Sequence, residues 1–164
     1  YGFNAVVVYP TNLYGPGDNF DPNTSHVIPA MIRKFEEARI RGEAHVELWG
    51  DGTPTREFLY VRDCADGLVR VLESYDSPAP LNLGSGVEIS IRELAEQIRQ
   101  LVSFEGSVNW NESYPNGQMR RCVDSSLAFR ALGFRATTSF KEGLAQTVRW
   151  WRRNFLCGAK DEVS

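Results

Sequence analysis

His26 is the residue best suited to proton transfer in this 164-residue sequence. An imidazole exchanges protons near neutral pH because its unperturbed pKa is about 6.5. His26 follows a loop, residues 10–25, that is rich in glycine, proline and asparagine, and it begins a predicted helix. Long loops of this kind often carry function. On the residues alone, two roles stay open for His26: an acid or base in catalysis, or a helix-terminal residue that caps its neighbours.

Several other arrangements that carry chemistry are missing from the sequence. No GxGxxG turn follows a strand, so the usual cradle for a dinucleotide pyrophosphate is not present. No tyrosine has a lysine four residues later, the spacing in which an ammonium group lowers the pKa of a catalytic phenol. The three cysteines and two histidines lack metal-ligand spacing. We therefore expect neither a metal site nor a disulfide framework.

The composition is that of an acidic protein with enough apolar residues for the core of one medium domain. The chain has 18 Lys and Arg against 21 Asp and Glu, a net charge of −3, and 42% apolar residues. The acidic balance argues against a nucleic-acid partner, and no apolar stretch approaches the roughly 18 residues of a membrane span. Few cysteines fit the reducing cytoplasm. Because the chain begins at Tyr1, we expect it to be part of a longer protein.

The elements that must position these residues alternate between strands and helices, which indicates an α/β fold. We expect strands at 4–9, 46–49, 57–61, 81–83 and 108–110, and helices from His26, Asp63, Ser90, Asp124 or Ser125, and Ser139, with a polar loop at 114–121. Capping boxes mark the third helix, with Ser90 and Glu93, and the fifth helix, with Ser139 and Glu142. The core face of the second helix is predicted by an apolar stripe of Ala65, Leu68, Val69 and Leu72. The last helix is expected to bury Leu144, Val148 and Trp151. The strands are too few for a complete doubly wound sheet.

Several stretches together resemble the C-terminal half of GDP-L-fucose synthases, which are extended short-chain dehydrogenases/reductases. They are PTNLYGP at 10–16, DNF at 18–20, SHVIPA at 25–30, WGDGTPTREF at 49–58, LNLGSG at 81–86 and PNG at 115–117. The likeness covers nearly the whole chain up to about Arg153. The sequence departs from the family at Tyr9, Arg62 and Met119, where arginine, aspartate and proline are frequent.

The resemblance implies the C-terminal part of a Rossmann-type α/β fold, mostly its smaller substrate-binding domain. Residues 1–155 would form this portion, with the last part of the cofactor domain in residues 1–25, and residues 156–164 would be a flexible tail. The family converts GDP-4-keto-6-deoxy-D-mannose to GDP-L-fucose by NADP(H)-dependent 3,5-epimerisation and 4-reduction. The glycine-rich turn and the Ser-Tyr-Lys set would lie in the other half. We therefore expect the chain to be inactive alone and the complete enzyme to be a homodimer.

The resemblance also implies roles for individual residues. His26 would be the acid in epimerisation and would touch the nicotinamide of the cofactor. The other implied contacts are to the cofactor, from Pro10, Thr11, Asn12 and Leu13, and to the GDP-sugar, from Lys34, Trp49, Arg56 and Asn116. Arg56 is the main candidate for the diphosphate because a guanidinium can fork onto two phosphate oxygens, with Arg120 and Arg121 as further candidates.

Simpler explanations stay open beside these roles. Trp49 at a strand end is often a core residue, and the Asn116-Gly117 pair is a common turn signal. For the whole chain, one alternative is another nucleotide-sugar epimerase or dehydratase that does not need His26 as an acid. The other is a non-catalytic module that binds sugar nucleotides.

Overall fold

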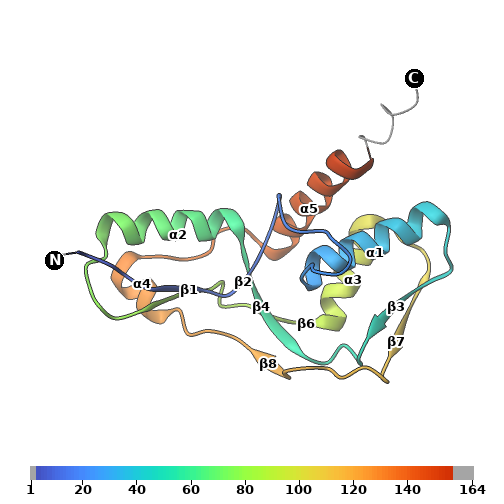
Figure 1. Cartoon of the computed structure of the whole chain (residues 1–164), viewed down its shortest axis with the longest axis horizontal. Helices are drawn as coiled ribbons and strands as arrows, with labels where there is room; N and C mark the ends of the chain where they lie inside the picture. The colour runs from blue at the N-terminus through green and yellow to red at the C-terminus, as the bar shows by residue number, and fades with distance from the viewer. Residues whose placement is uncertain (1–2, 157–164) are drawn as a thin grey trace.

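The computed structural model describes residues 3–156 (Figure 1). Its elements are, in chain order, β1 (Val8–Pro10), β2 (Asn12–Tyr14), α1 (Val27–Arg41), β3 (His45–Trp49), β4 (Thr55–Tyr60), α2 (Val61–Ser74), β5 (Leu81–Leu83), β6 (Glu88–Ser90), α3 (Ile91–Val102), β7 (Ser107–Asn111), β8 (Arg120–Arg121), α4 (Ser126–Leu132), α5 (Phe140–Trp151) and a π-helical turn, η1 (Arg152–Leu156). This mixture of helices and mostly parallel strands confirms the α/β fold class. Within the described range, no helix is both long enough and apolar enough to cross a membrane.

The strands form three small sheets. β1 pairs with β5 and β3 pairs with β7, both in parallel. The third sheet is built around β4, which pairs in parallel with β2 and β8 and antiparallel with β6. β4 therefore runs through the middle of the molecule and links segments that are far apart in sequence (Figure 1).

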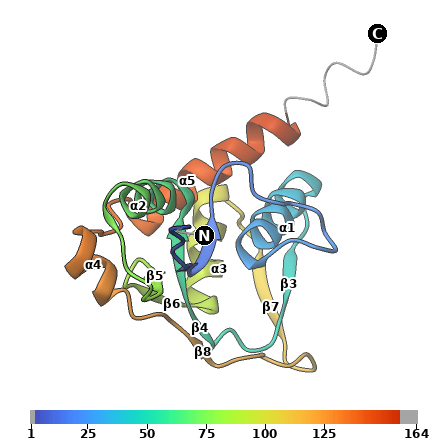
Figure 2. The same ribbon diagram turned by 60° about the vertical axis from the view of Figure 1, so that its left-hand side comes forward.

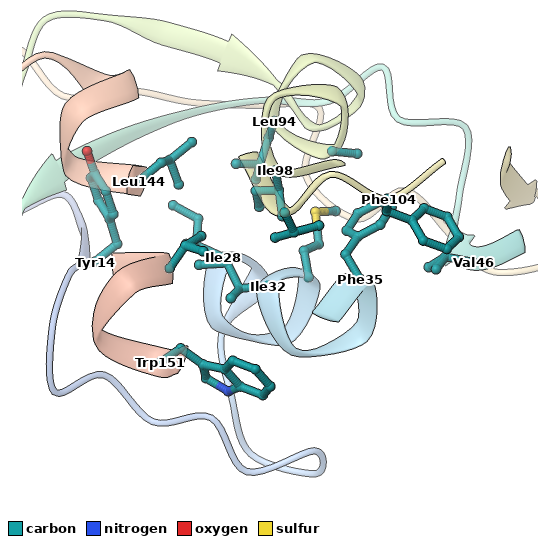
Figure 3. Packing of buried hydrophobic residues seen from close by; sticks show 14 of the residues in the cluster. Tyr14, Ile28, Ile32, Phe35, Val46, Leu94, Ile98, Phe104, Leu144 and Trp151 are labelled. Carbon is teal, nitrogen blue, oxygen red and sulfur yellow. The ribbon is translucent and has the colours of Figure 1, made fainter. Parts of the chain in front are cut away.

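Two apolar clusters pack on different sides of β4. Figure 2 shows α2 and α4 on one side of this strand and α1 on the other. The larger cluster joins α1, α3 and α5, with residues such as Ile32, Ile98 and Leu144 fully buried (Figure 3). The smaller cluster joins α2, α4 and β5. Phe58 and Leu59 are consecutive residues of β4 that belong to different clusters, because successive side chains of a strand point to opposite faces.

The observed helix starts agree only in part with those predicted from the sequence. At α3 the capping box is complete: Ser90 Oγ accepts from Glu93 N at 3.1 Å, and Ser90 N donates to the Glu93 carboxylate at 2.9 Å. At α5, Ser139 accepts from Glu142 N, which is half of the expected box. α2 begins at Val61, two residues before the predicted cap Asp63.

Three short strands lie in segments that we expected to be loops or did not assign: β2, β6 and β8. Each has two or three residues and exists because it pairs with β4, a partner that local sequence does not reveal. The first strand was predicted over residues 4–9, but in the structure it is β1, which is shorter and covers Val8–Pro10. The expected tail lies outside the described residues except for Leu156, which ends η1.

The predicted core face of α2 is wrong. Leu68, Val69 and Leu72 are exposed, and α2 instead buries Cys64 and Val71 with Gly67. A helix with apolar residues on two sides does not show from sequence alone which side is covered. The core face of α5 is confirmed, with Leu144, Val148 and Trp151 buried.

Candidate functional site

A cavity of about 600 Å³ opens at the carboxyl end of β1. Its walls are residues 10–13, Asp18, residues 26–29 at the start of α1, Arg56 and Phe58 of β4, and Arg121 of β8. It thus brings together the predicted cofactor residues Pro10, Thr11, Asn12 and Leu13, the predicted acid His26, and Arg56. Ligands of parallel sheets bind outside the carboxyl ends of the strands, so this position suits a binding site.

A second cavity, of about 520 Å³, shares Phe58 with the first but offers less chemistry. Its three carboxylates already accept hydrogen bonds from the protein. Asp63 accepts from Thr137, Glu88 from Arg120 and Glu93 from Ser90. We therefore place the candidate site in the cavity beside β1.

The His26 imidazole takes no part in capping the helix that His26 begins. His26 is the N-cap residue of α1, but its side chain makes no capping hydrogen bond, and the side chain is exposed. Within residues 3–156 the imidazole forms no hydrogen bond to another residue and instead lines the cavity. The structure thus contradicts the capping alternative and leaves both ring nitrogens available to a ligand.

Two arginines from neighbouring strands give the cavity its positive charge. Arg56 of β4 lies opposite Arg121 of β8 in the parallel register, and both line the cavity. Among the described residues, neither guanidinium forms an ion pair; Arg56 donates to the adjacent Thr55 carbonyl at 2.7 Å. Two unpaired guanidinium groups side by side suit a doubly charged anion.

Arg120 has a different environment, although it precedes Arg121 directly. Its Nε donates to both carboxylate oxygens of Glu88, at 3.1 and 2.9 Å, and it does not line the cavity. These hydrogen bonds from Arg120 lower the pKa of Glu88 to about 2. Arg120 therefore does not join Arg56 and Arg121 in the cavity, because strand alternation turns it toward Glu88.

The amino end of α1 and the Asp18 carboxylate are two further features that set the electrostatic potential of the cavity. The first N–H groups of α1 have no side-chain cap, and the positive end of a helix dipole attracts anions. Asp18 also lines the cavity. Its Oδ1 accepts from Asn19 N at 2.7 Å, its Oδ2 is buried without a partner in the described chain, and burial raises its pKa.

The cofactor residues predicted at 10–13 are fixed to β4 and β5. Thr11 N donates to the Leu83 carbonyl at 2.9 Å, and Asn12 Nδ2 donates to the Glu57 carbonyl at 2.8 Å. One of the two N–H donors of the Asn12 amide is therefore engaged in the fold, and its Oδ1 is left as an acceptor for a ligand.

Glu57 supports the site and was missed from the sequence. Its side chain is completely buried, and its two carboxylate oxygens accept from Gly86 N at 2.8 Å and from Val123 N at 2.9 Å. It therefore ties two loops to β4 and holds the segment that carries Arg121. The only available signal is an acidic residue directly before the apolar run Phe58–Tyr60.

The remaining predicted residues form a second group outside the cavity. The Trp49 indole is 63% exposed and stacks on Tyr114, with ring centroids 4.5 Å apart, and Lys34 Nζ lies 6.0 Å from the indole centroid. The core alternative for Trp49 is therefore wrong. Lys34 lies eight residues after His26 on α1, or about 12 Å along the helix axis.

Asn116 supports a different turn from the one that its own sequence pattern indicates, because residues 115–118 form no turn themselves. Its Oδ1 accepts from Asp51 N at 2.9 Å. Gly50 lies under this contact with a φ of +76°, and a Cβ there would collide with the Asn116 oxygen. Hydrogen bonds from Thr53 and, to a smaller extent, from the Asn116 side chain lower the pKa of Asp51.

No group of three or more His, Cys, Asp or Glu residues in the 3–156 range is arranged to hold a metal ion.

Comparisons with known proteins show which proteins the chain is similar to. The model of the NAD dependent epimerase/dehydratase family matches residues 1–84. GDP-L-fucose synthase 1 of Arabidopsis thaliana is 46% identical over 154 residues, which cover 94% of this chain and 47% of the relative. Probable GDP-L-fucose synthase 1 of Oryza sativa subsp. japonica is 43% identical over 160 residues, 98% of this chain and 48% of the relative.

The fold is also similar to a solved structure, a GDP-L-fucose synthetase from Naegleria fowleri bound to NADP. The TM-score is 0.86 at 31% identity, and the match covers 92% of this chain and 47% of the other. The chain therefore spans about half the length of the proteins that it matches.

Proposed function

The chain belongs to the NAD dependent epimerase/dehydratase family, and we propose that it forms the substrate-binding half of a GDP-L-fucose synthase-like enzyme. The reaction would be the NADPH-dependent 3,5-epimerisation and 4-reduction of GDP-4-keto-6-deoxy-D-mannose to GDP-L-fucose. The observation that carries this proposal is the convergence of residues 10–13, His26, Arg56 and Arg121 on one cavity. Plant relatives with this name, at 46% and 43% identity, support it.

His26 is the proposed acid of the epimerisation. Inversion beside a ketone requires that a proton leave one face of the sugar and that another be added to the opposite face. His26 suits the second step because its imidazole is exposed to the cavity and makes no hydrogen bond to the described chain. In this proposal it donates the proton to the enolate carbon and is reprotonated from solvent.

Arg56 and Arg121 are the proposed diphosphate contacts. In an acidic protein a diphosphate needs local cations, and these two line the cavity beside the uncapped end of α1. α1 then leads toward Lys34 and the exposed Trp49 ring, which offers a flat face to the guanine base. Asn116, whose side chain is held against the turn at Asp51, is the proposed further substrate contact.

The proposed cofactor is NADP(H), which when bound supplies the hydride for reduction at C4 of the sugar. Pro10, Thr11, Asn12 and Leu13 fit its nicotinamide end, because the Asn12 Oδ1 acceptor is left for the carboxamide N–H group. His26 lies across the same cavity. The sequence has no glycine-rich phosphate cradle, so these residues hold only that end of the cofactor.

We also propose a division of the chain, a location and an oligomeric state. Residues 1–25 belong to the cofactor side, and α2, β5 and α4 join them because they pack in one cluster with residues of β1. The complete enzyme would be a cytoplasmic homodimer.

Calorimetric titration of the 164-residue chain with GDP-L-fucose tests the anion site. We expect Arg56→Met and Arg121→Met each to weaken binding at least tenfold, because each removes a guanidinium from the cavity. Arg120→Met is the matched control, since Arg120 is held by Glu88 outside the cavity, and it should leave the affinity unchanged. Equal effects of the three substitutions would contradict the proposal.

Activity tests the role of His26. The chain is joined to the remaining half of the Arabidopsis thaliana relative, and the hexose product is identified by NMR. We expect His26→Asn to abolish epimerisation while reduction continues, so that the product becomes an unepimerised 6-deoxyhexose. Normal GDP-L-fucose from this variant would favour another epimerase or dehydratase, and binding of GDP-L-fucose without any turnover would favour a non-catalytic module.

A further inference from the structure

Inverting two carbons of one sugar requires His26 to be recharged with a proton. In the proposed reaction, on which this inference rests, C3 and C5 are both inverted, and each inversion ends when an acid adds a proton to the enolate carbon. The imidazole gives one such proton at a time. It must therefore regain a proton between the two inversions, while the sugar and the nicotinamide occupy the cavity in front of it.

Asp18 lines two cavities. Besides the candidate site, it lines a smaller cavity of about 130 Å³, whose other walls are residues 13–17 and Val61. Of the described residues, Leu13 and Asp18 line both cavities, and Asp18 is the titratable one of the two. The smaller cavity is open to solvent and has room for several water molecules. His26 and both arginines of the site line only the larger cavity, so a ligand bound to them leaves the water of the smaller cavity in place.

The loop holds the Asp18 carboxyl group in a fixed position. Its Oδ1 accepts from Asn19 N at 2.7 Å. The next residue, Phe20, is buried and stacks on Trp150, with ring centroids 5.7 Å apart, and its carbonyl accepts from Arg33 Nη1 at 3.0 Å. The carboxyl group is therefore anchored through one oxygen and through the backbone beside it.

The second carboxyl oxygen is left for proton exchange. Asp18 Oδ2 is buried and has no hydrogen-bond partner within residues 3–156, which is uncommon for a buried polar atom. Burial raises the pKa of Asp18, and the hydrogen bond from Asn19 N and the positive charge of His26 oppose this rise. The two side chains are thus close enough for their charges to interact. A carboxyl group with a raised pKa takes up and releases a proton nearer neutral pH than an exposed aspartate does.

We propose that Asp18 relays protons from water in the smaller cavity to His26 between the two inversions. The neutral carboxyl group gives its proton to the neutral imidazole, directly or through one water molecule, and the carboxylate regains a proton from solvent. Each inversion adds one proton to the sugar and removes one on the opposite face, so the reaction consumes no net proton. Arg56 and Arg121 share the cavity but cannot act as relays, because a guanidinium group stays protonated.

Asp18→Asn tests the relay in the joined enzyme described above. The amide oxygen still accepts from Asn19 N, but an NH₂ group takes the place of Oδ2 and cannot relay a proton. We expect GDP-L-fucose to form at least tenfold more slowly, with product inverted at only one carbon detected by NMR. Added formate should restore the rate, because a small acid can enter the open cavity and supply the missing proton. GDP-L-fucose binding, measured by calorimetry, should not change.

Asp21→Asn is the matched control in the same loop. The Asp21 carboxylate also accepts from backbone N–H groups, those of Asn23 at 2.9 Å and Thr24 at 3.1 Å, but it lines neither cavity. This variant should form GDP-L-fucose at the unchanged rate and should not respond to formate.

Three results would overturn the proposal: an Asp18→Asn variant with the full rate, a slow variant that formate does not restore, or a loss of rate accompanied by an equal loss of binding. The last two would show a structural role of the loop. His26→Asn separates this proposal from the proposed function. If that substitution abolishes epimerisation and Asp18→Asn does not slow it, only the relay is wrong, whereas normal GDP-L-fucose from His26→Asn contradicts both.

Discussion

Arg120 and Arg121 show that a shift of one position along a strand decides which groups a side chain contacts. The two are neighbours in β8, and successive side chains of a strand point to opposite faces. One meets the Glu88 carboxylate, and the other reaches the cavity beside Arg56. The same residue type therefore has a structural role at one position and a proposed binding role at the next.

The Glu88–Arg120 pair should contribute to stability in a pH-dependent way. Arg120 lowers the pKa of Glu88 from 4.5 to about 2, so the ionised form is favoured in the folded chain. Its contribution is present above pH 4.5 and is lost as the pH falls toward 2. We expect Arg120→Met to lower the free energy of unfolding at pH 7 but not at pH 2, as measured by urea denaturation.

Arg153→Met serves as the control for this measurement, because Arg153 is exposed on η1 and forms no ion pair within residues 3–156. A loss of stability for Arg120→Met that is equal at both pH values would show that packing, rather than charge, is what Arg120 contributes.

The cavity residues that could be predicted from the sequence are those that lie within contiguous motifs. His26 and residues 10–13 could be predicted because each lies in a recognisable stretch, and Arg56 follows a glycine turn. The roles of Glu57, Arg120 and Arg121 depend on contacts between segments far apart in sequence. Examples are the pairing of β4 with β8 and the hydrogen bond from Val123 N to Glu57. No local pattern contains that information.

Among the elements, the helices were predicted better than the strands. The start of α3 follows from Ser90 and Glu93, and the end of α4 follows from Gly133, which adopts a left-handed conformation. The strands β2, β6 and β8 depend on β4 for their existence, and their two or three residues carry too little pattern to be recognised. The prediction of the buried face of α2 was wrong for a related reason, because the elements that pack against a helix decide which face is buried.

The two serine caps allow a direct comparison of complete and partial capping. Ser90 exchanges hydrogen bonds with Glu93 in both directions, whereas Ser139 only accepts from Glu142 N, at 3.3 Å. We expect Ser90→Ala to cost about 1 kcal/mol in the free energy of unfolding, within the usual range for an N-cap, and Ser139→Ala to cost less. Urea denaturation of the two variants under one set of conditions gives the comparison, and a larger loss at Ser139 would contradict it.

At the scale of the molecule, β4 separates two clusters of unequal size. The cluster of α1, α3 and α5 holds most of the buried apolar residues, and the cluster of α2, α4 and β5 is small and adjoins the uncovered flank of α2. Regions with few buried apolar contacts open at lower free energy than the rest of a protein.

Native-state hydrogen exchange should therefore differ between the two clusters. Leu83 in β5 and Ile98 in α3 are both fully buried, so burial alone does not distinguish them. We expect amides of β5 and α4 to exchange at least tenfold faster than those of α3, because their cluster is smaller. Equal rates would show that the molecule opens as one cooperative unit.

The stacked indole of Trp49 gives the molecule an optical signal of its own. Of the four tryptophans in the sequence, it is the exposed one in the described chain, and the other three are partly or fully buried. Its fluorescence emission should lie at longer wavelength than theirs and be quenched selectively by iodide in the surrounding water. A nucleotide base that binds against this ring shields it from the quencher, so binding at Trp49 can be followed without any label.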